Sequence, residues 1–272
     1  MGLRISRRSL PILGMVLGLV ILTLVFGTHL SREKESCLDG DQDALNGSDE
    51  GEKRKAGPRI EPFEAHTARY DEWFERYKEA YESELLALKD LVAEADRSIE
   101  IGVGSGRFAT PLSVRFGVEP SPKMAKLSRA RGIHVLLGVA EALPFQDATF
   151  DLALMVTTVC FVDDISTAFK EASRVLRPNG VFVIGFIDQS SALGRSYQKL
   201  REGNPFYNLA TFRSLREVLG HLQDAGFRGF EIRQTISRKP SATSSVEEPK
   251  EGYGVGSFVA VKAVRPASPN PG

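Results

Sequence analysis

The chain has 272 residues, and its 35 basic and 35 acidic side chains leave no net charge, so it lacks the basic excess of proteins that coat nucleic acid. Its hydrophobic content of 42% is that of an ordinary globular protein and excludes disorder of the whole chain. Two cysteines and four scattered histidines form neither a disulfide framework nor a metal-ligand spacing, and no metal is expected.

An apolar segment, residues 10–30, contains no Asp, Glu, Lys or Arg and follows a basic N-terminus, residues 1–9. As a helix rising ~1.5 Å per residue it would reach ~30 Å, the thickness of a bilayer core. The segment therefore predicts an uncleaved transmembrane anchor. A cleaved signal peptide is the alternative, although the segment is long for one and no A-x-A site closes it.

The remainder of the chain divides by composition. Residues 31–60 are charged and nearly free of large apolar side chains, which predicts a flexible linker. One globular domain is expected at 61–264, followed by a disordered tail at 265–272. The domain opens with an amphipathic helix or helix pair at 64–92.

Strand-like and helix-like segments then alternate along the domain. Short apolar runs predict seven strands, at 98–103, 115–118, 134–139, 150–156, 181–186, 229–236 and 257–263. Helical spacing predicts helices at 122–131, 166–176 and 214–226. This order is typical of an α/β fold with a doubly wound, seven-stranded, mostly parallel sheet covered on both faces. Ligands of such sheets bind at the carboxyl ends of the strands.

A glycine-rich turn ends the first predicted strand, with Gly102, Gly104 and Gly106 following the acid Glu100. Glycines let the backbone approach a ligand closely, and a helix beginning here would offer free N–H groups. Glu119 lies at the end of the second strand, where an acid can accept hydrogen bonds from both hydroxyls of a ribose. The pattern therefore predicts a nucleoside-containing cofactor.

In five ordered elements the chain resembles the class I S-adenosylmethionine-dependent methyltransferases of the type 11 group, which have a Rossmann-like fold. The elements are 100–106, Glu119, AEALPF (140–145), FDLALMV (150–156) and EASRVLRPNGVFVIG (171–185). VTTVCFVDD (156–164), FYNLATFRS (206–214) and EGYGVGSFV (251–259) resemble a narrower prokaryotic branch, some members of which are described as histamine N-methyltransferase-like.

The resemblance implies S-adenosyl-L-methionine as the cofactor. The turn would contact its methionyl part, with Glu100 beside the amino group, and Glu119 would bind the ribose. Many relatives have Asp where Val139 stands, so the side-chain contact to the adenine amino group is in doubt. The implied cofactor-binding residues are Glu100, Gly102, Gly104, Gly106, Glu119, Ala140, Glu141 and Thr157.

Three segments are expected to form the pocket for a small-molecule methyl acceptor. Their candidate residues are Tyr70, Trp73, Cys160, Phe161, Phe206, Tyr207 and Phe212. Cys160 is expected to be a small buried hydrophobe, because transfer from a sulfonium needs no protein nucleophile. No catalytic acid or base can be assigned, since the acceptor atom is unknown.

Two alternatives to a soluble-metabolite enzyme remain open at this point. A membrane anchor would suit a methyltransferase of quinone or lipid acceptors, and a chain that had lost catalysis could still bind cofactor and recruit a partner. The positive-inside rule favours an outside domain, whereas the cytosolic source of S-adenosylmethionine favours a cytoplasmic one. The prediction is a single-pass membrane protein with a cytoplasmic catalytic domain, no nucleic-acid partner and an unassigned oligomeric state.

Overall fold

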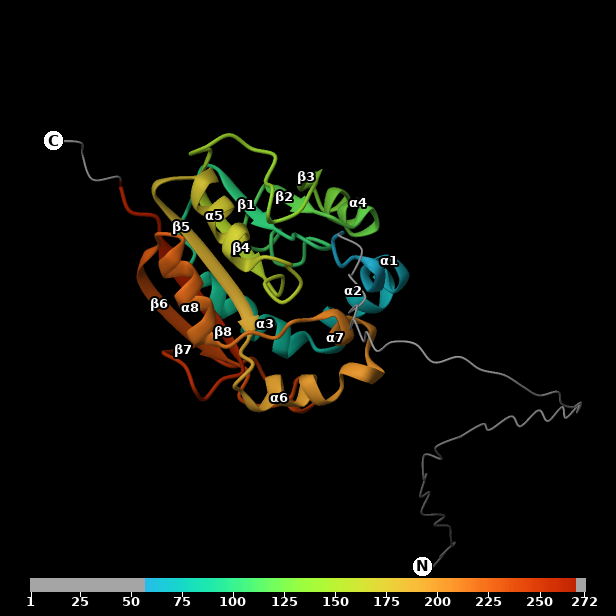
Figure 1. Cartoon of the computed structure of the whole chain (residues 1–272). Coiled ribbons are helices and arrows are strands. Elements are labelled where there is room, and N and C mark those ends of the chain that lie inside the picture. Colours follow the sequence, from blue (N-terminus) through green and yellow to red (C-terminus); the bar gives the residue numbers. More distant parts are fainter. Residues whose placement is uncertain (1–56, 268–272) are drawn as a thin grey trace, which may run out of the picture. The chain divides into compact units, whose positions relative to one another are not determined.

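A sheet of eight strands runs through the part of the chain that the computed structural model describes, residues 57–267 (Figure 1). In chain order the strands are β1 (Ser98–Ile101), β2 (Phe116–Glu119), β3 (His134–Leu137), β4 (Phe150–Val156), β5 (Leu176–Ile187), β6 (Arg228–Thr235), β7 (Lys250–Glu251) and β8 (Phe258–Val264). Their spatial order is β3-β2-β1-β4-β5-β8-β6-β7. The first five are parallel to one another, whereas β8 pairs antiparallel with both β5 and β6.

The strand order reverses between β1 and β4. From β1 the chain proceeds outward through β2 to the edge strand β3, and then returns to place β4 on the other side of β1. Because the loops after β1 and β4 diverge to opposite sides, they leave a crevice at the carboxyl ends of these strands. The fold therefore positions the loop at 102–106 and the loop at 157–164 at one opening.

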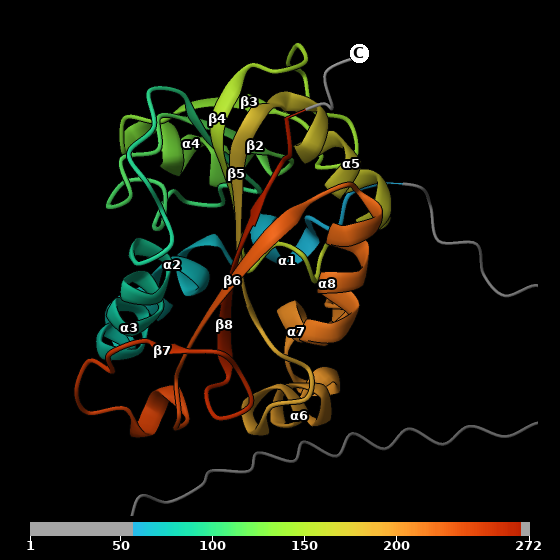
Figure 2. The same ribbon diagram turned by 90° about the vertical axis from the view of Figure 1, so that its left-hand side faces the viewer.

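Helices cover both faces of the sheet. They are α1 (Glu61–Ala65), α2 (Thr67–Arg76), α3 (Lys78–Lys89), α4 (Pro122–Ala130), α5 (Ile165–Val175), α6 (Ala192–Lys199), α7 (Pro205–Leu209) and α8 (Leu215–Asp224). Figure 2 shows α2, α3 and α4 on one face, α5 and α8 on the other, and α6 and α7 beyond one end of the sheet. The two faces bury separate apolar clusters, one around Phe169 and Phe182 and one around Leu88 and Phe258. β1 and β4 are buried almost throughout, which explains their continuous apolar sequences.

The opening helical segment is three helices rather than one helix or a pair. His66 and Tyr77 have non-helical backbone angles, with ψ of 35° and 48°, and they separate α1, α2 and α3. The breaks change the direction of the chain, so aromatic side chains four residues apart do not follow one continuous stripe.

Side-chain caps fix where several helices begin. The hydroxyl of Ser214 accepts a hydrogen bond from the N–H of Glu217 at the start of α8. The carboxylate of Asp164 accepts one from the N–H of Thr167 at the start of α5. Ser121 and Ser191 cap α4 and α6 in the same way. Each cap satisfies an N–H group that has no partner within its helix.

The structure corrects the predicted fold class in two respects, the number of strands and the transmembrane helix, and with the second it corrects the predicted localisation. The sheet has eight strands instead of seven, because the two-residue strand β7 extends its edge beyond β6. The prediction of a transmembrane helix, and with it of a single-pass membrane protein, is wrong for the described chain. No helix within 57–267 is both long and apolar enough to cross a membrane. Residues 10–30, to which the prediction applied, lie outside the described residues.

Candidate functional site

The glycine turn after β1 is built from backbone conformations that favour glycine. Gly102, Gly104 and Gly106 have φ of 71°, 54° and 85°, in the left-handed region. A Cβ on Gly102 would lie 2.3 Å from Cγ2 of Thr158, so no side chain fits at this position. The turn can therefore expose its backbone to a bound molecule.

No helix follows this turn, contrary to the expectation of a helix N-terminus. The residues after the turn, 107–113, form hydrogen-bonded turns instead. Pro111 lacks an N–H group and disfavours a helical conformation at Thr110, and Ser113 has a positive φ of 57°. The polar groups of the site at this point therefore come from the turn and from side chains.

Glu119, at the end of β2, faces the turn across the crevice. Its Oε2 accepts a hydrogen bond of 2.9 Å from the N–H of Gly104, and its Oε1 accepts one of 2.9 Å from the N–H of Ser121. Burial raises the pKa of Glu119 to about 7, although these two hydrogen bonds oppose the rise. The carboxylate is thus fixed in position and titrates near neutral pH.

Glu100 lies beneath the turn and does not line the cavity. Its side chain is 1% exposed, and its Oε2 has no hydrogen-bond partner among the residues described. Burial raises its pKa well above the usual range. A buried carboxyl oxygen without a partner is costly and is a common feature of functional sites.

The loop after β3 brings Ala140 and Glu141 to the opposite wall of the crevice. A bridge between Val139 and Ala142 closes this loop. The carboxylate of Glu141 turns away to accept hydrogen bonds from the N–H groups of Asp163 and Asp164, at 2.7 and 3.2 Å. Its side chain therefore joins this loop to the start of α5.

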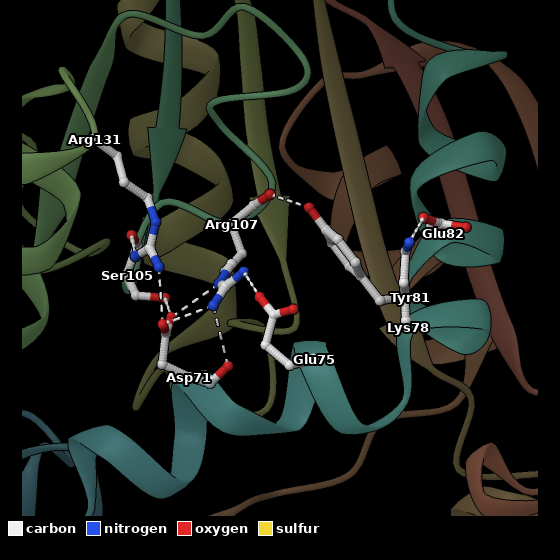
Figure 3. Close-up of polar contacts among 8 residues, drawn as sticks. All are labelled: Asp71, Glu75, Lys78, Tyr81, Glu82, Ser105, Arg107 and Arg131. Atoms are coloured by element: carbon white, nitrogen blue, oxygen red, sulfur yellow. Dashed lines mark hydrogen bonds and ion pairs between the residues drawn. The ribbon is translucent and has the colours of Figure 1, made fainter.

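A network of ion pairs joins α2 to the glycine turn (Figure 3). The carboxylate of Asp71 accepts hydrogen bonds from Ser105 Oγ at 2.7 Å, from Arg107 Nη2 at 2.7 Å and from Arg131 Nη2 at 2.8 Å. Burial would raise the pKa of Asp71, but these hydrogen bonds outweigh it and hold the pKa well below the usual range. Sequence reasoning missed all members of this network, because they are far apart in the chain.

Because of this network, Tyr70 is held over the turn. A Cβ on Gly104 would lie 3.5 Å from the Tyr70 hydroxyl oxygen, in van der Waals contact. From α3, the hydroxyl of Tyr81 donates a hydrogen bond of 2.6 Å to the carbonyl oxygen of Arg107. The helices α2 and α3 are therefore both connected to the loop after β1, which is expected to hold the cofactor.

One cavity of about 860 Å³ joins these elements. Of the predicted site residues, all but Glu100 and Gly106 line it: Tyr70, Trp73, Gly102, Gly104, Glu119, Ala140, Glu141, Thr157, Cys160, Phe161, Phe206, Tyr207 and Phe212. This volume is near the upper limit of the roughly 300–1,000 Å³ typical of ligand sites. The structure thus brings the expected cofactor and acceptor residues to a single space.

Aromatic rings form much of the wall away from the turn. Phe63 of α1, which sequence reasoning missed, packs edge-on against Phe161 with ring centroids 5.0 Å apart, and lies 5.3 Å from Phe206. Tyr197 of α6, also missed, stacks on Tyr207 at 4.4 Å. No periodicity links these rings, since they come from α1, α6, α7 and the loop after β4.

Cys160 has the surroundings of an unreactive thiol. Its Sγ donates a hydrogen bond of 3.4 Å to the carbonyl oxygen of Thr157. Burial raises the pKa of this thiol to about 12, so the thiolate is scarce at neutral pH. The side chain contributes to the cavity wall as a small apolar group.

The doubly wound sheet, the glycine turn and the strand-end acid together define a protein that binds a nucleoside-containing cofactor at its topological switch point. Residues 99–184 match the family described as Methyltransferase domain. A solved S-adenosylmethionine-dependent methyltransferase from Thermotoga maritima, described as a possible histamine N-methyltransferase, is 47% identical. It matches with a TM-score of 0.74 over 76% of this chain and 99% of that one.

Two uncharacterized proteins are also similar in sequence. One, from Methanocaldococcus jannaschii, is 40% identical over 201 residues, which is 74% of this chain and 97% of the relative. The other, from Mycobacterium tuberculosis, is 37% identical over 203 residues, 72% of this chain and 71% of the relative. The chain belongs to the S-adenosylmethionine-dependent methyltransferases. It is an enzyme, and its cofactor is S-adenosyl-L-methionine.

Proposed function

We propose that this enzyme transfers a methyl group to a small-molecule acceptor bound in the same cavity as the cofactor. The observation that carries the proposal is that one space is lined both by Gly102, Gly104 and Glu119 and by the aromatic side chains of α2, α6 and α7. A donor and an acceptor held in one enclosed site react as if at a very high local concentration.

The residues of the turn fit the cofactor. A carboxylate offers about four acceptor sites, and Glu119 uses one on each oxygen for a backbone N–H, so each oxygen can still accept a ribose hydroxyl. Glu100 remains the residue assigned to the cofactor's amino group: its Oε2 has no partner in the described chain, and the turn would have to move aside for the two groups to meet. Gly106 completes the turn, and Thr157 lines the cavity after β4.

The loop at 139–142 is assigned to the adenine. Oε1 of Glu141 accepts hydrogen bonds from the N–H groups of Asp163 and Asp164, which fixes the side chain toward α5, and we assign the contact to the base to the backbone of Ala140 and Glu141. This agrees with the presence of Val139 in place of an aspartate, since the valine side chain offers no hydrogen bond.

Positioning and desolvation by the aromatic wall supply the catalysis. When bound, S-adenosylmethionine supplies a methyl group on a positively charged sulfur. As a lone pair of the acceptor bonds to the methyl carbon, the bond between this carbon and the sulfur breaks, and the sulfur leaves as a neutral thioether. Tyr70 and Trp73 of α2 with Phe206 and Tyr207 of α7 hold the acceptor and exclude water from it. We assign no general base.

Methyl transfer to three classes of acceptor tests the proposal. The full-length protein is incubated with S-adenosylmethionine carrying a labelled methyl group and with primary amines, thiols or phenols, and methylated products are identified by mass. Amines are tested first, because the Thermotoga relative is described as a possible histamine N-methyltransferase. Binding of the cofactor without transfer to any small molecule would refute the proposed class of acceptor.

A further inference from the structure

Glu84 on α3 is a buried acid that the proposed catalytic machinery does not use. It lines the cavity, and its side chain is only 4% exposed. Within the described residues its carboxyl group has no hydrogen-bond or ion-pair partner, unlike those of Glu119 and Asp71. Buried carboxylates are normally paired, so a cavity-lining carboxyl group without a partner indicates a place for a ligand.

Tyr81 of α3 and Tyr197 of α6 lie close enough to this carboxyl group to interact with its charge. Burial is the main cause that raises the pKa of Tyr81 on the same helix and of Tyr197 on α6, and the charge of Glu84 adds to both rises. Tyr197 stacks on Tyr207, with ring centroids 4.4 Å apart, at the wall of the cavity. Aromatic faces attract cations, and a carboxylate among them makes a site with affinity for an ammonium group.

Basic side chains of the cavity do not neutralise Glu84. Burial alone raises the pKa of Glu84, to about 8, and no basic group of the described chain opposes the rise. Arg59 pairs with Asp163, and Arg213 pairs with Glu217. Arg69, Arg76 and Lys239 also line the cavity, and none of the three forms an ion pair with Glu84 or lowers its pKa. The positive partner that Glu84 lacks can therefore come from a ligand.

We propose that Glu84 binds the ammonium group of a bifunctional amine acceptor, with Tyr197 and its neighbours around the cation. This inference rests on the proposed function, and it names the acceptor class. α3 contacts β5, β6 and β8, whereas the cofactor turn follows β1 on the other side of β4. An ammonium nitrogen has no lone pair, so the methyl group goes to a second nucleophilic atom of the same molecule, and Glu84 acts as a binding residue.

Proton balance gives the expected pH dependence. At pH 7 an acid with a pKa of about 8 is mostly neutral, and forming the ion pair with an ammonium group releases its proton to water. The affinity for a cation therefore rises by up to about tenfold per pH unit below pH 8 and levels off above it. The affinity for a neutral molecule of the same shape shows no such rise.

The test uses three probes that share a phenyl ring and a two-carbon spacer: 2-phenylethylamine, 2-phenylethanol and 3-phenylpropionate. Each is titrated by calorimetry into the full-length protein saturated with S-adenosylhomocysteine, at about pH 6.5 and about pH 8.5, on either side of the pKa of Glu84. The variants are Glu84→Gln, which keeps the side-chain shape, and Glu82→Gln. Glu82 lies on the same helix in an exposed pair with Lys78 and serves as the matched control (Figure 3).

At the higher pH, wild type and Glu82→Gln are expected to bind the amine at least about tenfold more tightly than the alcohol, and the propionate least. Glu84→Gln is expected to lose this preference while binding S-adenosylhomocysteine as wild type does. A preference that survives Glu84→Gln, no rise with pH, or no binding of the amine would overturn the inference and leave the proposed function standing. If Glu84→Gln does not fold, the pH series on wild type decides. Failure of wild type to bind S-adenosylhomocysteine would instead overturn the proposed function, and this inference with it.

Discussion

Replacing Glu119 with alanine tests the proposed ribose contact directly. In the structure its two carboxylate oxygens are held by the N–H groups of Gly104 and Ser121, each at 2.9 Å. The substitution removes both proposed acceptors of the ribose hydroxyls and leaves these two N–H groups without an acceptor. It leaves the strand β2 and the glycine turn otherwise unchanged in sequence.

The magnitude follows from the two hydrogen bonds that would be lost. A hydrogen bond to a charged group contributes about 1.5–3 kcal/mol, so two of them set an upper limit of about 3–6 kcal/mol. Water can enter the space left by the carboxylate, because Glu119 lines an accessible cavity, and it replaces part of each interaction. We therefore expect a loss of about 1–3 kcal/mol, which is about 5- to 150-fold in Kd.

The assay is calorimetric titration with S-adenosylhomocysteine at about pH 8, where a carboxyl group with a pKa of about 7 is ionised. Glu231→Ala is the control, since within residues 57–267 this exposed acid forms its one ion pair with Lys262 on the neighbouring strand. In wild type, affinity is expected to rise with pH up to about 7 and then level off, because the ionised carboxylate is the stronger acceptor. A folded Glu119→Ala variant that binds within about twofold of wild type would show that this acid does not contact the ribose.

Three further substitutions test the surroundings of the cofactor turn. Asp71→Asn removes the charge that holds Arg107 and Arg131, and it is expected to lower the free energy of unfolding by about 1–3 kcal/mol and to weaken binding of S-adenosylhomocysteine. The control is Glu75→Gln, at the exposed partner of Arg107, which should change the free energy of unfolding and the free energy of binding by less than about 0.5 kcal/mol each. Gly102→Ala combines a positive φ with a Cβ 2.3 Å from Thr158, so thermal melts should show a loss of about 2–4 kcal/mol, only partly restored by adding Thr158→Ala. Cys160→Ala should retain methyl transfer within about tenfold, because the mechanism uses no thiolate; complete loss in a folded variant would contradict this reading.

The cofactor side of the site could be predicted from sequence because its signals are local. The glycines that need a positive φ follow β1 directly, and Glu119 is the last residue of the next strand. In a parallel sheet, neighbouring strand ends meet at one edge, so short motifs are sufficient to place these groups together. The helix that was expected after the turn does not form, and the reason is equally local, because Pro111 disfavours a helical conformation at the residue before it.

The acceptor side could not be predicted in the same way. On a continuous helix, Trp73, Tyr77 and Tyr81 would share one face, but the break at Tyr77 divides them between two helices. Tyr81 instead packs against Phe74 and donates a hydrogen bond to the loop after β1. The same break sets the rotation of α3 and so decides that Glu84, and not Glu82, faces the cavity.

Membership of the family establishes the cofactor of this enzyme but not its methyl acceptor, because the cofactor side and the acceptor side of the cavity come from different parts of the chain. The matched family region, 99–184, contains the glycine turn, Glu119 and the loop after β4, the segments that we propose hold the donor. Glu84 and the aromatic residues of α2, α6 and α7 lie outside it, and they form the wall against which an acceptor would bind. Because donor chemistry is common to the family while this wall comes from separate segments, the substrate must be deduced from the wall's own charge and shape. That wall is aromatic and includes the buried acid Glu84, whose carboxyl group has no hydrogen-bond or ion-pair partner in the described chain, which favours a cationic amine.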